Sequence, residues 1–324
     1  MRLATPLVAL LLHASALPGA QCLMCDETRV TTGLGDRLLS FWAACLYARI
    51  HEERLLSQWR ANLAVDADRA YNKALLSVPL DCQLTDVNHF RPWHGCTSSF
   101  HLRGWHLAYS LGTPSLVLER AKNESRGVRG VQEWTTQRAV AEFRRIAQAT
   151  GLTPALTPFA DAATLGRATC VHLRGTDKLS AGDTNATMNY SRAQWARLRQ
   201  RSLQILAAKA EAASSLDVYV VGDDQDGVRA YGDDVAALGQ NVRLVAPRTP
   251  RTTRHVAGLG AYLDFFRLAS CADIILVGRF SGFSLGASLV GNSTLFIFDE
   301  GPPATDHMHS WAEVAHIQFV DLRK

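Results

Sequence analysis

The 324-residue sequence has no block of like charges, and its net charge is only +4. It also has no low-complexity tract, no internal repeat and no long hydrophobic run after the N-terminus. Duplex nucleic acid or an anionic membrane surface is therefore not the expected partner, because clustered cations drive binding to both. The P-loop, GxSxG and HExxH motifs are absent as well, which leaves no support for a kinase, a serine hydrolase or a zincin protease.

Hydrophobic residues make up 47% of the chain and charged residues 20%, a composition that packs cores and argues against disorder. The length suits one large domain or two ordinary ones. A local anionic ligand fits the mild positive charge better than an extended polyanion does.

The first twenty residues resemble a secretory signal peptide. Arg2 precedes an apolar stretch over residues 3–12, and small residues near Ala16 and Ala20 offer cleavage sites. The stretch is short for a bilayer span, so we expect a cleaved signal over 1–20, with an uncleaved short anchor as the alternative. The expected location is the ER or Golgi lumen, or outside the cell. Four glycosylation sequons agree with this route: Asn123, Asn185, Asn189 and Asn292.

The seven cysteines leave at least one thiol unpaired. In an oxidising lumen Cys22 could bridge to Cys25, and Cys82 to Cys96, although connectivity cannot be deduced from sequence. The other three cysteines lie in apolar contexts and are expected to be packed thiols. They are Cys45, Cys170 and Cys271.

The N-terminal half has the weaker pattern of elements. A short segment over 28–32 precedes a glycine-rich turn, and apolar residues then recur at the helical period up to Ile50. Residues 54–59 are expected to form a strand, 78–110 a loop-rich stretch, and 131–149 a helical region. The best linker candidate is 151–158, which contains one glycine and two prolines.

The C-terminal half alternates strands and helices more regularly. Strands are expected at 168–173, 217–221, 242–245, 273–277 and 294–298, the last closing the series. Helices are expected at 191–213, with Ser191 as N-cap, at 261–270, and from Ser284 to Val290. This alternation predicts an α/β fold with a mostly parallel, doubly wound sheet. The expected division is an N-terminal, acceptor-side domain over 21–155 and a C-terminal, donor-binding domain over 156–324.

The most informative motif follows the apolar strand at 168–173. It consists of His172, Leu173, Arg174, Gly175, Thr176, Asp177 and Lys178. In an open α/β sheet, ligands bind beyond the carboxyl ends of the strands, so Arg174 and Lys178 would face a binding crevice. A guanidinium fork matches a phosphate group, and the lysine adds a second positive charge. A charged surface turn is the alternative.

A second glycine motif precedes the first helix. Gly33 and Gly35 resemble half of a dinucleotide fingerprint without its third glycine, which also fits a tight turn with close helix packing. Asp36 and Arg37 would then point into the same cleft.

Two further motifs follow strands in the C-terminal half. Asp223 and Asp224 come after an apolar strand and could accept hydrogen bonds from a ribose or a base, or could cap the next helix. Ser281, Gly282, Phe283 and Ser284 lie between a strand and a helix, where backbone N–H groups and hydroxyls form either an anion site or a simple N-cap.

Asp264, expected near the start of a helix, has two interpretations. It is either a favourable charge at a helix N-terminus or a guanine-binding carboxylate, because it can accept from the adjacent N1–H and N2–H donors of that base.

A metal site is not expected. The spacing of His89, His94, Cys96, His101 and His106 fits no common zinc pattern and suggests a packed loop.

Together these segments resemble a known family. GLGDRLLSFWAACLYAR followed by RLLSQWR is similar to the N-terminal region of the bacterial nodulation fucosyltransferases and, more distantly, of the animal α1,6-fucosyltransferases of N-glycan cores. HLRGTDK resembles their HxRRTDK motif, VYVVGDD their strand ending in paired aspartates, and LDFFRLASCADIILVGRFSGFS their third motif. The motifs occur in the same order from about residue 28 to 298.

The resemblance implies two Rossmann-like domains of GT-B type and transfer of fucose from GDP-fucose to a glycan or glycoprotein hydroxyl, with inversion and without a required metal or other cofactor. It implies that Arg174 holds the β-phosphate, that His172 and Asp264 bind guanine, and that Ser281 contacts phosphate. Asp177, Lys178, Asp223 and Asp224 would line the donor site. Asp36 and Asp177 are the candidate general bases.

The chain departs from the family at Gly175, where the family has a second arginine. This loss implies weaker donor binding, compensation by Arg279 or Arg267, or a different donor. The alternatives are a peptide O-fucosyltransferase, another GDP-sugar transferase, or a secretory protein that binds GDP-sugars or glycans without catalysis.

Overall fold

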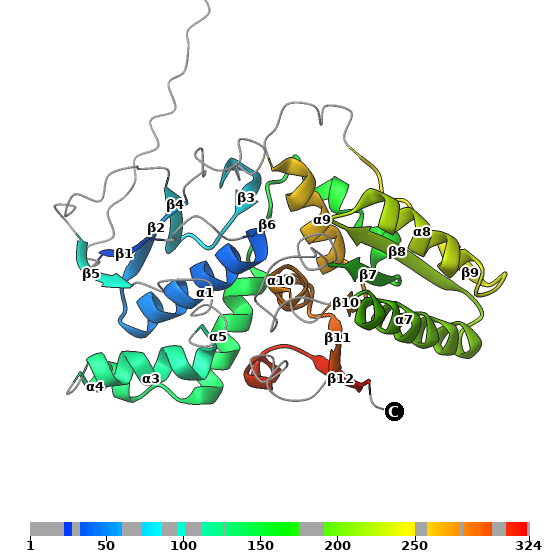
Figure 1. Cartoon of the computed structure of the whole chain (residues 1–324). Helices are drawn as coiled ribbons and strands as arrows, with labels where there is room; N and C mark the ends of the chain where they lie inside the picture. Colours follow the sequence, from blue (N-terminus) through cyan, green and yellow to red (C-terminus); the bar gives the residue numbers. More distant parts are fainter. Residues whose placement is uncertain are drawn as a thin grey trace, which may run out of the picture.

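The computed structural model describes residues 23–27, 33–59, 73–85, 96–100, 112–125, 128–174, 191–249, 258–278, 281–299 and 309–322. The chain forms two α/β halves, each built on a parallel sheet, with α10 between them (Figure 1). This arrangement confirms the predicted α/β class with two Rossmann-like units. Within the described residues, no helix is long and apolar enough to cross a membrane.

The N-terminal half contains a four-stranded sheet in the order β4-β2-β1-β5, and all three of its pairings are parallel. Its strands are β1 (Leu23–Glu27), β2 (Arg54–Gln58), β4 (Cys82–Thr85) and β5 (Cys96–Phe100). Its helices are α1 (Leu34–Ile50), η2 (Lys73–Leu75), α3 (Pro114–Glu124), α4 (Arg129–Gln132) and α5 (Thr136–Gln148). The stretch predicted as loop-rich therefore contributes two strands, because short strands with mixed composition carry little periodicity.

Residues 151–158, predicted as a linker, are part of the packed structure. Strand β6 (Gly151–Leu152) pairs antiparallel with β3 (Leu76–Ser77), and a 3-10 helix, η3 (Thr157–Ala160), follows. Leu152 and Ala160 are buried. The domain boundary at 155 stays a prediction, since the hydrophobic core is continuous between the two halves.

The C-terminal half contains a six-stranded parallel sheet in the order β12-β11-β10-β7-β8-β9. Its strands are β7 (Thr169–Leu173), β8 (Leu216–Gly222), β9 (Val242–Leu244), β10 (Asp273–Val277), β11 (Thr294–Asp299) and β12 (Ile317–Asp321). Its helices are α6 (Ala162–Leu165), α7 (Arg192–Ala212), α8 (Gln225–Ala236), α9 (Leu259–Ala269), α10 (Gly282–Gly291) and η5 (Ser310–Glu313).

Five of these strands were predicted to within two residues, and Ser191 caps α7 through a capping box with Gln194. Strand β12, which pairs with β11, was missed; the expectation that 294–298 closes the series was wrong. Strand order reverses between β7 and β10, the topological switch point at which open α/β sheets bind ligands.

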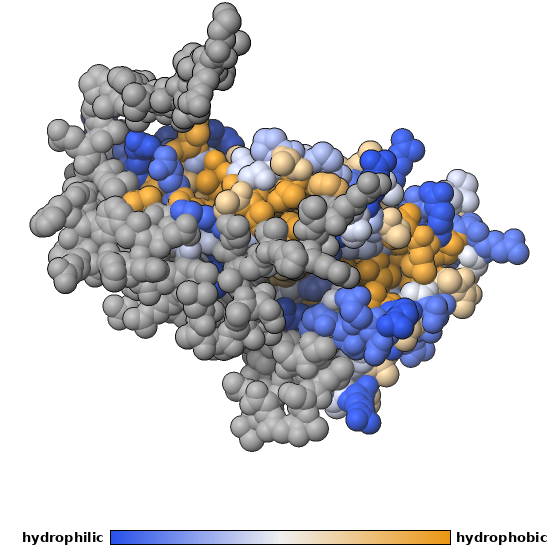
Figure 2. Space-filling model, turned by 90° about the horizontal axis from the view of Figure 1, so that it is seen from above, coloured by the Kyte–Doolittle hydropathy of each residue, from blue (hydrophilic) through white to orange (hydrophobic). Residues whose placement is uncertain are grey.

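Helix α1 is buried almost all round, because fourteen of its seventeen residues are buried. Its neighbours include the N-terminal helices α3 and α5 and the C-terminal helix α10. The buried indole of Trp42 donates to Thr150 Oγ1 at 3.0 Å, so this polar group is satisfied inside the core. In Figure 2 a band of hydrophobic residues runs from left to right across the described part of the face. One buried hydrophobic cluster joins the two halves, and a second cluster lies within the C-terminal half.

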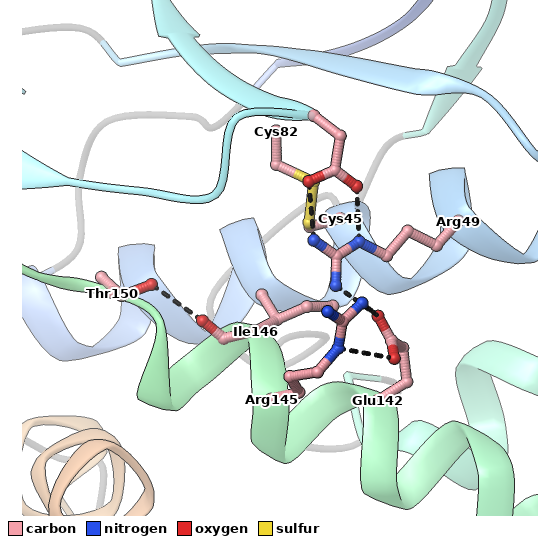
Figure 3. A network of polar contacts seen from close by, with 8 residues as sticks. Cys45, Arg49, Cys82, Glu142, Arg145, Ile146 and Thr150 are labelled. Atoms are coloured by element: carbon pink, nitrogen blue, oxygen red, sulfur yellow. Dashed lines mark hydrogen bonds and ion pairs between the residues drawn. A yellow bond between two sulfur atoms is a disulfide. The ribbon is translucent and has the colours of Figure 1, made fainter.

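A disulfide and an ion-pair network fasten α1 to its neighbours (Figure 3). Cys45 is bonded to Cys82. Arg49 donates to both carboxylate oxygens of Asp81 at 2.6 Å and also to Glu142 of α5. Hydrogen bonds from Arg49 hold the pKa of Asp81 below its usual value, although burial opposes the shift. The network fixes the end of α1 against β4 and α5.

The two described disulfides differ from the expected pairing. Cys82 pairs with Cys45 and not with Cys96, and Cys170 pairs with Cys271, so the expectation of three packed thiols was wrong. Apolar surroundings suit a buried disulfide as well as a thiol, which is why sequence context misled here. Cys22 lies outside the described residues.

Candidate functional site

The candidate site lies at the carboxyl ends of β7 and β10. Side chains alternate along β7, so Val171 and Leu173 face the core under α7 and α8, while Cys170 belongs to the core under α9 and α10. By the same alternation His172 faces α10. Arg174 follows the strand directly and continues the sheet, because its N–H donates to Val277 O at 3.1 Å.

His172 links the β7 motif to the start of α10. Its Nδ1 lies 2.6 Å from Ser284 Oγ, and its ring centroid lies 5.4 Å from that of Phe283. Burial, followed by the charge of Arg174, lowers the pKa of His172 to about 4, whereas Asp223 opposes the shift. The imidazole is therefore neutral near pH 7 and acts as a hydrogen-bonding group rather than as a cation.

The Ser281–Ser284 motif begins α10. Ser281 is the N-cap, and its hydroxyl accepts from Ser284 N–H at 3.3 Å. The N-cap interpretation of this serine is therefore confirmed. Anion binding by the same helix start is a separate property, because the first N–H groups of any helix point outward without intrahelical partners.

The start of α1 packs directly against the start of α10. An ideal Cβ on Gly35 would lie 2.3 Å from the backbone carbon and oxygen of Gly282 and from the nitrogen of Phe283. Gly35 therefore allows the close backbone approach that the sequence motif suggested. Two helix N-termini from opposite halves meet beside His172.

Gly35→Ala is expected to destabilise the protein by about 1–3 kcal/mol or more, because a methyl group would collide with backbone that cannot rotate away. Gly33→Ala is the matched control, since an added Cβ there meets nothing within 4 Å and its φ of −66° suits alanine. Urea unfolding of both variants measures the difference. Equal midpoints for the two variants would contradict the close contact.

Asp36 and Arg37 occupy the first turn of α1 and project in different directions, as consecutive helical residues do. Arg37 is buried, with its guanidinium carbon 5.8 Å from the ring centroid of Trp59. Asp36 is half-buried. Trp59 ends the strand predicted over 54–59 and comes directly after the observed β2, and no functional role was predicted for it.

The paired aspartates at the end of β8 differ in role. Asp224 caps α8 by accepting from Asp226 N–H at 3.1 Å, which is the helix-capping alternative. Asp223 is exposed, and its charge acts on His172. The structure thus brings Asp223 near the β7 motif and assigns its neighbour to the helix.

Asp264 lies in the middle of α9, so its interpretation as a charge at a helix start was wrong. Its Oδ1 accepts from the Tyr219 hydroxyl and from Arg267 Nη1, both at 3.3 Å. Burial raises the pKa of Asp264, and the positive charge of Arg267 and the two hydrogen bonds oppose that rise. The next residue, Phe265, contacts Phe283, with ring centroids 5.2 Å apart.

Arg267 is buried, and its guanidinium nitrogens are bonded within the protein. Its guanidinium donates to Phe159 O at 3.1 Å, to Arg248 O and to Asp264. These contacts occupy all three guanidinium nitrogens, which disfavours compensation by Arg267 for the missing second arginine. Tyr219 could not be predicted as a partner of Asp264 because it lies on β8, whereas Arg267 stands three residues after Asp264 on α9, a spacing at which helical side chains meet.

Several predicted site residues lie outside the described residues: Gly175, Asp177, Lys178 and Arg279. The histidines at 89, 94, 101 and 106 lie outside them too. Among the side chains that the structure describes, no group of three histidine, cysteine, aspartate or glutamate residues could hold a metal ion.

No family model and no curated protein matches the sequence. Three solved structures illustrate what the chain is similar to in structure. NodZ alpha-1,6-fucosyltransferase soaked with GDP-fucose is 18% identical, with 86% of this chain and 96% of that chain covered and a TM-score of 0.47. Fucosyltransferase NodZ from Bradyrhizobium is 18% identical, with 84% and 94% covered and a TM-score of 0.46. POFUT1 in complex with GDP-fucose is 10% identical, with 84% and 96% covered and a TM-score of 0.48.

Proposed function

We propose that this chain is a glycosyltransferase that moves fucose from GDP-fucose to a glycan hydroxyl with inversion, in the manner of an α1,6-fucosyltransferase. The observation that carries the proposal is the convergence of three distant motifs at one switch point. Gly35 touches Gly282, and His172 bonds Ser284. These motifs resemble those of the fucosyltransferases, and their meeting point is where an α/β sheet binds a nucleotide.

The chemistry that such a site has to perform is charge stabilisation. When the bond between fucose C1 and the β-phosphate oxygen breaks, the electron pair leaves with GDP and negative charge grows on the phosphate. The Arg174 guanidinium and the N–H groups at the start of α10 stabilise this charge more in the transition state than in the ground state. The acceptor oxygen then bonds to C1 from the opposite face.

The acceptor hydroxyl has to lose its proton during attack, which requires a general base. Asp36 is the candidate within the described residues, because it stands in the first turn of α1 next to Gly35. Asp177 is the second candidate. In this proposal His172 and Asp264 bind guanine, Asp223 faces the ribose, and Lys178 adds charge near the phosphates.

Labelled GDP-fucose tested against a glycan array and against folded protein acceptors decides the reaction. We expect transfer to a glycan. Transfer to a protein hydroxyl would indicate a peptide O-fucosyltransferase, transfer from a different GDP-sugar would change the donor, and tight GDP binding without transfer or hydrolysis would indicate a binding protein. Absence of GDP binding would overturn the proposal altogether.

Activity is expected to persist in excess chelator. A site that surrounds the pyrophosphate with Arg174, Lys178 and the first turn of α10 needs no divalent ion to neutralise it. Raised salt should weaken donor binding, because it screens these cations. Loss of transfer in EDTA with recovery in Mg²⁺ or Mn²⁺ would show instead that a cation takes the position left by Gly175.

The proposed location is the lumen of the ER or Golgi, or the extracellular space. The disulfides Cys45–Cys82 and Cys170–Cys271 support it, because structural disulfides persist in oxidising compartments. Fractionation of cells expressing the full chain, with glycosidase treatment of the sequons, tests the assignment. A cytosolic, unglycosylated product would contradict it.

A further inference from the structure

Arg267 is an unusual residue for the interior of the C-terminal half. Its side chain is only 6% exposed, and each of its three guanidinium nitrogens has a partner from a different segment. One partner is Phe159 O of η3, one is Arg248 O after β9, and the third is Asp264 on its own helix. Burial of a cation costs free energy, and hydrogen-bond partners repay that cost, so these three contacts hold the guanidinium in one position.

The contacts of Asp264 leave one side of its carboxylate for a ligand. Tyr219 and Arg267 both donate to Oδ1. The side chain is 35% exposed, so it is reachable from solvent, unlike Arg267 beneath it. A carboxylate held through one oxygen presents the other in a fixed direction, which suits a base edge with adjacent N–H donors.

Arg267 also fixes the chain segment that follows β9. The Arg267 guanidinium donates a hydrogen bond to Arg248 O. The N–H of Arg248 in turn donates to Asp161 Oδ2 at 3.0 Å. Asp161 is itself buried and held by Thr164 Oγ1 at 3.0 Å. Both backbone polar groups of Arg248 are therefore fixed, which ties the segment after β9 to Arg267 of α9.

We propose that Arg267 is a positioning residue for base selection: its hydrogen bond to Oδ1 holds the Asp264 carboxyl group aimed at the N1–H and 2-amino donors of a guanine nucleotide. This inference rests on the proposed function and names a residue that acts through another. Two groups that titrate or carry charge face Asp264 in the described structure, Arg267 on α9 and Tyr219 on β8. The η3 and 245–249 segments contribute backbone carbonyls to the same cluster.

Without the guanidinium, Asp264 keeps the burial that raises its pKa and loses the charge that opposes it. Protonation then removes an acceptor, and it does so at a higher pH than in the native protein. Arg267→Met is therefore expected to weaken GDP binding by about 10- to 100-fold, the loss usual for a hydrogen bond to a charged group. The weakening should deepen as pH falls from 8 to 5.5.

The experiment measures binding of GDP and inosine diphosphate by calorimetry across this pH range. Inosine diphosphate lacks the 2-amino group, so the ratio of the two affinities reports base selection alone. We compare the native chain, Arg267→Met, Asp264→Asn and the double variant. Arg267→Met should lower the ratio of GDP affinity to inosine diphosphate affinity and raise its pH midpoint, the pH at which this ratio is half-maximal. In the double variant, where residue 264 is asparagine, the Arg267 substitution should cause no further change.

Arg243→Met is the control for loss of an arginine–aspartate pair elsewhere, because Arg243 pairs with Asp217 at the amino end of the same sheet and is exposed. It should leave the ratio and the midpoint unchanged. If Arg267→Met fails to fold, Tyr219→Phe removes the other donor to Oδ1 with little change in volume and should shift the midpoint in the same direction, by less.

The outcomes separate this inference from the proposed function. A native chain that binds neither nucleotide would overturn the proposed function. A native chain that prefers GDP, together with an Arg267→Met variant that keeps the native ratio and midpoint, would overturn only the positioning role. A further fall of the ratio in the double variant would show that Arg267 acts independently of Asp264, which also contradicts the inference.

Discussion

Arg174→Ala is expected to reduce fucose transfer by about 10²–10³-fold, the usual cost of losing one donor that stabilises developing negative charge. The fold should survive, because Arg174 lies beyond the end of β7 and alanine keeps the backbone N–H that bonds Val277 O. The rate constant for transfer and the thermal midpoint, measured on the same preparations, test both parts.

Arg174→Lys should not restore the rate, since an ammonium group lacks the fork that matches two phosphate oxygens. Arg229→Ala, an exposed arginine on α8, is the control for a general loss of positive charge. Native turnover in Arg174→Ala would remove the phosphate role from this residue. A fall in rate matched by a fall in thermal midpoint would indicate a structural role instead.

Replacing Cys170 and Cys271 by alanine is expected to cost about 4.7 kcal/mol of unfolding free energy. The disulfide closes a sequence separation of 101 residues, and the chain-entropy model gives about this value for a loop of 100. The bond joins β7 to the turn between α9 and β10, two residues before His172 and four after Arg267. Its loss should therefore also reduce GDP binding at temperatures close to the unfolding midpoint.

The Cys45–Cys82 disulfide is the internal comparison. It spans a separation of 37 residues, for which the same model gives about 4 kcal/mol, so its removal should be the milder of the two. Urea unfolding midpoints of the two double-alanine variants measure the order. An unchanged midpoint on removal of the Cys170–Cys271 bond would show that the β7–β10 backbone ladder alone fixes this region.

Much of the C-terminal half followed from local patterns. The strand that carries His172 and the strand that precedes Asp223 are short apolar runs followed by polar residues. Both the strands and the location of these functional residues could therefore be predicted. The same logic failed for β4 and β5, whose sequences lack a continuous apolar run. It failed for α3 too, although Thr113 and Pro114 form a reasonable start signal.

Side-chain partners could not be predicted in the same way. The apolar context of Cys45 and Cys170 fits a thiol and a buried disulfide equally well, and connectivity depends on which elements the fold brings together. The helix that carries Asp264 was predicted, but Asp264 lies in its middle and not near its start. Helix starts are the least reliable part of such a prediction.

The sequence by itself determined the α/β class, the position of Arg174 after a buried strand and the presence of small residues at Gly35 and Gly282. These depend on local periodicity and on backbone sterics, which a few neighbouring residues set. Only the tertiary structure decided that Gly35 meets Gly282, that His172 bonds Ser284 and that Tyr219 donates to Asp264. The first two contacts join residues more than a hundred positions apart, so sheet order and helix packing select them rather than any local preference. Arg267 and Asp264 are three residues apart on α9, and the fold adds to this local pair the carbonyl groups of Phe159 and Arg248.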